Sequence, residues 1–462
     1  MDHDDLPGWS ARAAAWVRDY HAGLRDRPVR AQVAPGELRA ALPAAAPEAP
    51  EDPEAIFADF ERLIPGALTH WQHPRFFAYF PANAAPASML AEQLTAGIAA
   101  QGMLWQTSPA ATELEQVTVD WLRRALGLPD GFAGTIHDSA TTATLSAVLT
   151  MRERALGYAG LTEGLSGAPR LRLYASAQTH SSVDKAARLA GIGQANLVKV
   201  PVREDLSMDP DALAAAIADD RAAGHLPMGV VFCAGGTGVG AFDDVAACLP
   251  ACDGLPTHLD AAWAGSAMIC PEFRHLWAGV GACDSIVLNP HKWLGVQFDC
   301  AVQLLRDPAA QLRALGLRPD YLETLEADAV VDFNEWTVPL GRRFRALKLW
   351  FVLRAYGLEG LRARIRDHVA WAEALCAALA EVDGIEIVTA PRLALFTFAA
   401  GEDAATEALL RHVNARGRVY LTQTRHGGRF AIRVSVGSWD CTRADVMCVA
   451  DEVRAGLAAL GA

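Results

Sequence analysis

Short apolar runs alternate with helix-like stretches through the middle of the chain, and this alternation restricts the fold more than any other feature. Each run is rich in Val, Ile, Leu or Phe and is short enough to form one buried strand. Such alternation is typical of an α/β domain with a mostly parallel sheet, whose ligand site lies at the carboxyl ends of the strands. The expected strands cover residues 131–137, 171–176, 196–201, 228–234, 255–260, 285–289 and 300–306.

Length and charge restrict the class of protein. A chain of 462 residues is too long for one hydrophobic core, so we expect two or more domains. Its 52% hydrophobic and 21% charged residues are typical of a globular protein. The formal net charge of -13 disfavours nucleic acid and anionic membranes, because both attract basic surfaces. No apolar run reaches the roughly 20 residues that a membrane span needs, so we expect neither partner.

The cysteines and the N-terminus indicate a compartment. Nine cysteines, without C-x-x-C spacing, favour reduced thiols over a disulfide framework. The first residues, M-D-H-D-D-L-P-G-W, are acidic and lack the apolar segment of a signal peptide. We therefore expect a cytoplasmic enzyme, and we predict no metal site.

One lysine stands at the end of an expected strand. The apolar run 285–288 is ended by Pro290, because proline has no N-H for a strand ladder, and Lys292 follows directly. Between an imidazole and the ring of Trp293, this lysine would lose hydration, which would lower its pKa and free an amine to condense with a carbonyl. A solvated surface lysine would also explain the pattern, so the lysine by itself leaves both interpretations open.

An acid upstream favours the catalytic interpretation. Asp260 ends the expected strand 255–260 and is followed mainly by small residues in H-L-D-A-A-W-A-G. A pyridoxal phosphate (PLP) enzyme needs a lysine for the aldehyde and a carboxylate that keeps the pyridine nitrogen protonated. Lys292 and Asp260 are the candidates for these two groups.

The two segments together resemble a known family. Residues 258–275, followed by N-P-H-K-W-L at 289–294, resemble the group II PLP-dependent decarboxylases, and among them the aromatic L-amino acid decarboxylases. The resemblance implies PLP-dependent fold type I of the aspartate aminotransferase kind, with a mostly parallel seven-stranded sheet, in a homodimer with shared active sites. It also implies three parts: an N-terminal helical segment packed on the partner, a large PLP-binding domain and a small C-terminal α/β domain, at 1–85, 86–357 and 358–462.

The same resemblance implies a set of cofactor-binding residues. Hydroxyl residues after the first strand favour a phosphate at a helix start, although they are also ordinary helix caps. His180 is expected to stack on the cofactor ring and to relay protons. Thr237 is expected near the cofactor phenol or the substrate carboxylate. The phosphate ligands implied are Ser139, Ala140, Thr141, Asn289 and His291.

The expected substrate pocket is aromatic. An apolar wall for a flat side chain is implied at Trp71, Tyr79, Phe80 and Pro81. A strip from the partner subunit is implied at Gln101 and Met103, where family members that use catechol or phenol substrates usually carry bulky apolar residues. Gln101 and Met103 depart from that pattern, and the amide of Gln101 could meet a ring hydroxyl, an indole N-H or water. The preferred aromatic amino acid therefore stays open.

The product depends on a proton donor. Counting back from P-L-G-R-R-F-R at 339–345 puts Phe333 where the family has a lid tyrosine, and phenylalanine cannot donate a proton. The leading prediction is decarboxylation to an aromatic amine, with His180 as an alternative donor. The alternative is an aromatic aldehyde synthase, which uses dioxygen and releases aldehyde, ammonia and peroxide. Phe333 could also simply close a lid, and a PLP-binding protein without turnover is a third interpretation.

Overall fold

The computed structural model describes residues 1–317 and 329–461. Contacts divide the chain into two compact units. The large unit comprises Ala82–Ala370 and Pro391–Leu395, and the small unit comprises Met1–Pro81, Trp371–Ala390 and Phe396–Ala462. The three-part division expected from the sequence stays a prediction.

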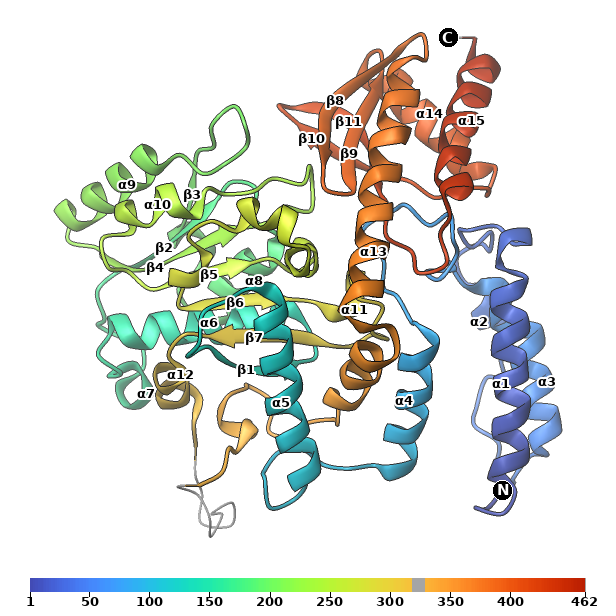
Figure 1. Cartoon of the computed structure of the whole chain (residues 1–462), viewed down its shortest axis with the longest axis horizontal. Coiled ribbons are helices and arrows are strands. Elements are labelled where there is room, and N and C mark those ends of the chain that lie inside the picture. The colour runs from blue at the N-terminus through green and yellow to red at the C-terminus, as the bar shows by residue number, and fades with distance from the viewer. Residues whose placement is uncertain (318–328, 462) are drawn as a thin grey trace. The chain divides into compact units, whose positions relative to one another are not determined.

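The large unit is built on a seven-stranded sheet with the order β1-β7-β6-β5-β4-β2-β3 (Figure 1). β7 runs antiparallel to both of its neighbours, and the other neighbouring strands are parallel. The mostly parallel sheet predicted from the sequence is thus confirmed. The strands are β1 (Ala133–His137), β2 (Leu171–Ser176), β3 (Leu197–Val200), β4 (Leu226–Cys233), β5 (Thr257–Asp260), β6 (Ser285–Leu288) and β7 (Ala301–Leu305).

Helices pack on this sheet through apolar faces. Val148 and Met151 of α6 and Val183 of α8 are buried against Leu173 of β2 and Val231 of β4. Burial of such side chains contributes roughly 1.5–3 kcal/mol each, so these contacts hold the helices on the sheet. The helices of this unit are α4 (Pro86–Ile98), α5 (Pro109–Leu126), α6 (Ala140–Ala155), α7 (Gly160–Glu163), α8 (Ser181–Leu189), α9 (Pro210–Ala222), α10 (Val245–Cys248), α11 (Pro290–Trp293) and α12 (Pro308–Leu315).

The small unit has a four-stranded sheet with the order β10-β11-β9-β8. Thr442 and Asp445 form a capping box that fixes the start of its last helix. The long helix α13 (Ala346–Ala380) belongs to the large unit up to Ala370 and to the small unit from Trp371, and it is interrupted at Gly357, whose φ of 61° is not helical. The strands and remaining helices are α1 (Leu6–Ala22), α2 (Glu37–Ala41), α3 (Pro53–Leu63), β8 (Ile385–Arg392), β9 (Leu395–Ala400), α14 (Asp403–Ala415), β10 (Thr422–His426), β11 (Arg429–Ser435) and α15 (Arg443–Leu460).

The aromatic segment near residue 76 is attached to the C-terminal part of the small unit. The N-H of Phe77 donates to the carbonyl of Tyr420 at 3.0 Å, and the N-H of Ser435 donates to the carbonyl of Phe77 at 3.0 Å. Phe76 forms an isolated parallel bridge with Tyr420. These backbone bonds explain why residues far apart in the sequence share one compact unit.

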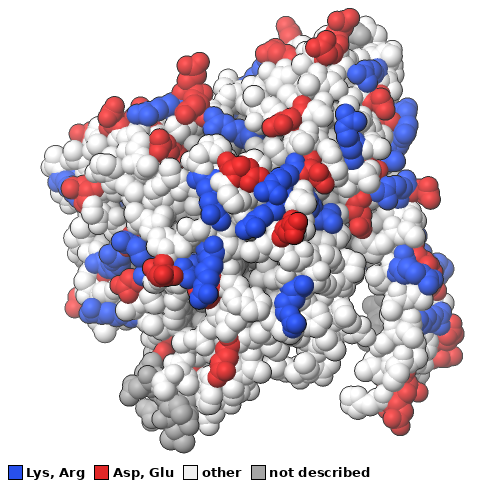
Figure 2. Space-filling view, viewed as in Figure 1, with Lys and Arg blue, Asp and Glu red and all other residues white. Residues whose placement is uncertain are grey.

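Charged side chains of both signs lie on the surface. On the face shown in Figure 2, acidic and basic side chains are intermingled and no broad basic patch is visible. Within the described ranges, every helix is too short or too polar to cross a bilayer.

Candidate active site

The ends of neighbouring parallel strands bring the candidate catalytic residues together. Asp260 is the last residue of β5 and pairs with Val287 of β6, and Lys292 follows β6 on the short helix α11. Because these strands are parallel, their carboxyl ends lie at the same edge of the sheet. The structure thus places Asp260 at the end of β5 and Lys292 just past the end of the adjacent strand β6, and their catalytic roles stay a prediction.

Asp260 is a buried acid with a fixed orientation. Its side chain is 7% exposed, and its Oδ1 accepts the N-H of Ala262 at 3.1 Å. Two residues earlier, burial lowers the pKa of His258 to about 4, and His258 Nδ1 lies 2.9 Å from Ser285 Oγ. His258 is therefore neutral at pH 7, and Asp260 provides the negative charge at this strand end.

Lys292 is held by its backbone. Its N-H donates to the carbonyl of Asn289 at 2.9 Å, and its carbonyl accepts Nδ2 of Asn83 at 2.6 Å. Next to it, the buried rings of Trp293 and Trp263 stack with centroids 4.8 Å apart. The half-buried lysine side chain therefore starts from a rigid turn, which suits a residue that must reach one carbonyl carbon.

His180 lies close to both charges. It precedes α8, and its Nδ1 accepts the N-H of Ser182 at 3.1 Å. Desolvation lowers the pKa of His180, and the positive charge of Lys292 acts in the same direction, while Asp260 opposes it. Both charges therefore act on His180, and the lowered pKa favours the neutral imidazole at pH 7.

The expected phosphate ligands lie around the start of α6. Ser139 caps this helix by accepting the N-H of Thr142 at 3.2 Å, Ala140 is its first residue, and Thr141 follows. Ala140 packs against Val287 of β6, which brings the helix start beside the strand that leads to Asn289 and His291. An exposed helix start offers N-H groups and a favourable dipole to a phosphate.

The lysine turn approaches this helix start with a buried amide. Asn289 is 4% exposed, and its Oδ1 has no hydrogen-bond partner within residues 1–317 and 329–461. Buried polar groups normally have partners, so an orphaned amide at this place fits a ligand with polar oxygen atoms. His291 Nδ1 accepts the N-H of Cys300 at 2.9 Å, and burial lowers the pKa of His291 to about 3.

Thr237 lies on a tight hairpin after β4. A Cβ on Gly235, whose φ is 79°, would lie 2.5 Å from the Cβ of Ala264, so only glycine allows this close approach. The hairpin is closed by Asp243, which accepts the N-H groups of Cys233 and Met208, both at 2.7 Å. Burial raises the pKa of Asp243 to about 7.

The expected substrate residues are divided between the two units. Trp71, Tyr79, Phe80 and Pro81 belong to the small unit, whereas Gln101 and Met103 belong to the large unit. In the small unit, Trp71 and Tyr79 stack with ring centroids 5.6 Å apart. That these residues meet substrate stays a prediction.

The strip that contains Gln101 and Met103 is bound to a later segment of its own chain. Gln101 Oε1 accepts the N-H of Arg342 at 2.7 Å, and the carbonyl of Met103 accepts the N-H of Asn334 at 3.0 Å. The amide of Gln101 is therefore oriented by the backbone, and its Nε2 is the end left to meet another group.

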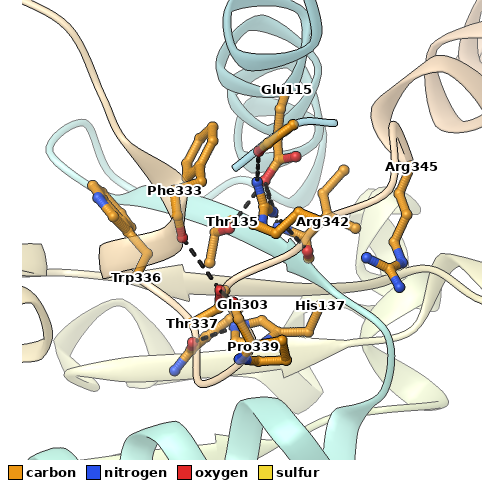
Figure 3. A network of polar contacts seen from close by, with 12 residues as sticks. Glu115, Thr135, His137, Gln303, Phe333, Trp336, Thr337, Pro339, Arg342 and Arg345 are labelled. Atoms are coloured by element: carbon orange, nitrogen blue, oxygen red, sulfur yellow. Dashed lines mark hydrogen bonds and ion pairs between the residues drawn. The ribbon is translucent and has the colours of Figure 1, made fainter. Parts of the chain in front are cut away.

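Phe333 is buried in the large unit, and its role as the residue in place of a lid tyrosine stays a prediction. Its side chain is 1% exposed and packs with Leu305 and Trp336, while the Arg342 guanidinium lies 4.7 Å from its ring centroid (Figure 3). Leu305 pairs with Ser285 at the start of β6, three residues and roughly 10 Å from the strand end near the lysine. The structure therefore places the Phe333 side chain in the interior of the large unit, against β7.

Sequence reasoning missed the residue that encloses Phe333. Arg342 is 5% exposed and donates to Glu115, to the hydroxyl of Thr135 and to the carbonyl of Ile136 at 2.6, 2.9 and 2.8 Å (Figure 3). Its only signal in the sequence is a pair of arginines in P-L-G-R-R-F-R, a charged run that would ordinarily indicate a surface.

Comparisons with known proteins agree with this geometry. A strand-end lysine and acid on a mostly parallel sheet define an α/β enzyme of the PLP type. Residues 35–400 match the pyridoxal-dependent decarboxylase conserved domain. The chain is 38% identical to the aromatic-L-amino-acid decarboxylase of Rattus norvegicus, over 98% of each chain.

Two solved structures are also similar. Oryza sativa TDC with PLP and tryptamine has a TM-score of 0.96 at 33% identity, covering 100% of this chain and 99% of that chain. Rhodiola rosea 4-hydroxyphenylacetaldehyde synthase has a TM-score of 0.93 at 34% identity, covering 100% of each. The chain belongs to the pyridoxal-dependent decarboxylase family, and its cofactor is PLP.

The residues present fit that cofactor. The start of α6 and the orphaned amide of Asn289 suit the phosphate, the buried carboxylate of Asp260 suits the pyridinium, and Lys292 suits the aldehyde. When bound, PLP draws electrons from the bond that breaks at the substrate Cα. The protein's part is to hold the pyridine nitrogen protonated, to orient the substrate and to manage protons.

Proposed function

We propose that this enzyme decarboxylates aromatic L-amino acids to aromatic amines and CO2. The observation that carries the proposal is that Asp260 and Lys292 end adjacent strands and that both charges act on His180. In this proposal Lys292 would bind the cofactor aldehyde, Asp260 would hold the pyridine nitrogen protonated, and the neutral imidazole of His180 would lie beside the cofactor. The relatives named as aromatic-amino-acid decarboxylases support the substrate class.

An aromatic substrate also suits the aromatic wall. Trp71 and Tyr79 are 39% and 48% exposed, although large aromatic rings are usually buried. A stacked pair of exposed rings supplies a flat apolar surface, which supports a substrate with a flat side chain. We assign Phe80 and Pro81 to the same wall and Gln101 and Met103 to its partner-derived edge.

We propose an amine as the product. The case for an aldehyde product rests on phenylalanine in place of a lid tyrosine, whereas the burial of Phe333 beneath Arg342 supports a packing role for this residue. A neutral His180 can accept a proton and return it at Cα.

We further propose a homodimer with shared active sites. Trp9, Trp16, Phe57 and Phe60 line an apolar groove of about 520 Å³ between α1 and α3 in the small unit. In the large unit, Leu90, Leu94 and Ile98 form an exposed stripe along α4, at 53%, 44% and 60% exposure. Exposed apolar faces of this size support association with another subunit.

A cytoplasmic location is proposed from the thiols. The nine cysteines of the chain are all buried and unpaired by disulfides. An oxidising compartment would favour disulfides in a secreted chain, so free thiols support a reducing one.

The test of the activity is direct. The PLP-loaded enzyme is incubated in air with tryptophan, phenylalanine, tyrosine or dihydroxyphenylalanine, and CO2, amine, aldehyde and peroxide are quantified. The proposal expects one amine per CO2 without peroxide. Peroxide and ammonia in step with CO2 would instead identify an aldehyde synthase. Borohydride reduction followed by peptide mapping must find the cofactor on Lys292.

A further inference from the structure

Tyr79 has a backbone conformation that a large side chain rarely adopts. Its φ is 46°, in the left-handed region. Such strain persists only where the surroundings enforce it, and it gathers at functional sites. The groups that hold Tyr79 in this conformation therefore indicate which function requires it.

Two strands of the small unit hold the backbone of Tyr79. Its carbonyl accepts a hydrogen bond from Nη1 of Arg433 on β11. Its N-H donates to the hydroxyl of Thr422 on β10 at 3.4 Å. Because β10 and β11 pair directly, with Thr422 opposite Arg433, one point of the sheet engages both polar groups of the strained residue.

Arg433 also contacts the next aromatic side chain. Its guanidinium carbon lies 4.5 Å from the ring centroid of Phe80, close enough for a cation-π contact. Arg433 is 3% exposed, and burial lowers its pKa to about 9. Desolvating a guanidinium opposes folding, and an aliphatic residue would fill this place without that cost. The burial of Arg433 is better explained by its contacts with Tyr79 and Phe80, whose orientation it fixes.

Tyr79 forms an outward aromatic surface with Trp71, at 48% and 39% exposure, and the buried ring of Phe80 follows it in the chain. The ring of Tyr79 stacks on Trp71 at an interplanar angle of 20°, and its hydroxyl lies 3.4 Å from that of Tyr420. A change of φ at Tyr79 would swing its ring away from Trp71. The left-handed backbone of Tyr79 is therefore what allows its ring to stack on Trp71.

We propose that Arg433 is a positioning residue for substrate binding, which sets Tyr79 and Phe80 in the arrangement that receives the aromatic side chain. This role rests on the proposed function of the aromatic wall. Arg433 acts through Tyr79 and Phe80 and takes no part in the bond changes at Cα.

The test compares Arg433→Met and Arg433→Lys with the wild-type holoenzyme. For Arg433→Met we expect KM for the preferred aromatic acid to rise about tenfold, with kcat within about threefold and an unchanged cofactor absorbance band. Lysine can donate to the Tyr79 carbonyl but lacks the planar group over Phe80, so Arg433→Lys should be intermediate. Arg425→Met is the matched control, because Arg425 lies on β10 and pairs with Asp403 at the surface.

A second variant and a second readout keep the test decisive. Thr422→Val keeps the side-chain volume but removes the acceptor for the Tyr79 N-H, and it should also raise KM. Near-ultraviolet circular dichroism reports the Trp71-Tyr79 stack without turnover: the component lost in Tyr79→Ala should also be lost in Arg433→Met. If Arg433→Met lowers the melting temperature and leaves both KM and the dichroism unchanged, Arg433 has no positioning role. The same result for Thr422→Val would show that the Tyr79 N-H bond has none. A wild-type enzyme inactive on all four acids would refute the proposed function, while the dichroism would still decide the role of Arg433.

Discussion

The carboxylate of Glu115 lies 2.6 Å from the guanidinium of Arg342, and both side chains are only 4% exposed (Figure 3). Glu115 belongs to α5, whereas Arg342 follows the segment that carries Phe333. The same carboxylate accepts the N-H of Ile136 on β1 at 2.8 Å. One ion pair thus fastens the 333–342 segment to a helix and to the edge strand of the sheet.

Breaking this pair should destabilise the large unit. Glu115→Gln leaves the Arg342 charge buried without compensation, so the free energy of unfolding should fall by about 3 kcal/mol. The control is Glu407→Gln, because Glu407 and Arg411 form an exposed pair one helical turn apart, which contributes under about 1 kcal/mol. Urea denaturation measures both changes. Equal losses in the two variants would show that the buried Glu115-Arg342 pair contributes no more to the free energy of unfolding than the exposed Glu407-Arg411 pair.

Phe333→Tyr should leave the product unchanged. Phe333 is 1% exposed and enclosed by Leu305, Trp336 and Arg342, so we expect a hydroxyl there to have no access to a substrate carbon. The new hydroxyl enters an apolar cluster, and the free energy of unfolding should fall by about 1–3 kcal/mol if it finds no partner. Amine and peroxide are quantified with urea denaturation beside them. A larger amine share in Phe333→Tyr would return this residue to the active site.

Most of the strands could be predicted because their signals are local. β6 is a buried, mainly apolar run, whereas β5 is buried along its length but has only Leu259 as an apolar residue. Once the two strands are parallel and adjacent, Asp260 and Lys292 lie at one edge of the sheet. That adjacency is a contact between distant segments, which the resemblance to the family implied and the apolar runs by themselves could not give.

Phe333 and Arg433 could not be placed in the same way. The surroundings of Phe333 come from β7 and from Arg342, and counting back along a loop says nothing about either contact. Arg433 reads as a charged residue within the strand F-A-I-R-V-S, and only the fold reveals that its partner is the carbonyl of Tyr79, 354 residues away. Contacts between distant segments decide both cases.

Lys292→Ala should lose the covalent link to the cofactor. Without the amine, the absorbance band of the lysine-bound cofactor should disappear, and kcat should fall by at least about 10³-fold. Lys185→Ala is the control, because Lys185 is an exposed residue of α8. Absorbance titration with PLP and CO2 release measure both effects. A retained band that borohydride fixes in Lys292→Ala would place the Schiff base on another lysine.

Acid should destabilise the fold through its buried histidines, and His258 provides the test. Burial lowers the pKa of His258 to about 4, whereas an unfolded histidine titrates near 6.5. The unfolded chain therefore binds more protons between these values, so the contribution of His258 to stability is complete above pH 6.5 and is lost as the pH falls toward 4. From pH 7 to pH 5 this residue should account for a loss of roughly 2 kcal/mol. Urea denaturation at both values should show a smaller loss for His258→Gln than for the wild type, whereas His275→Gln, at an exposed position, should match the wild type. An equal loss in His258→Gln and the wild type would mean that His258 keeps its proton in the folded state.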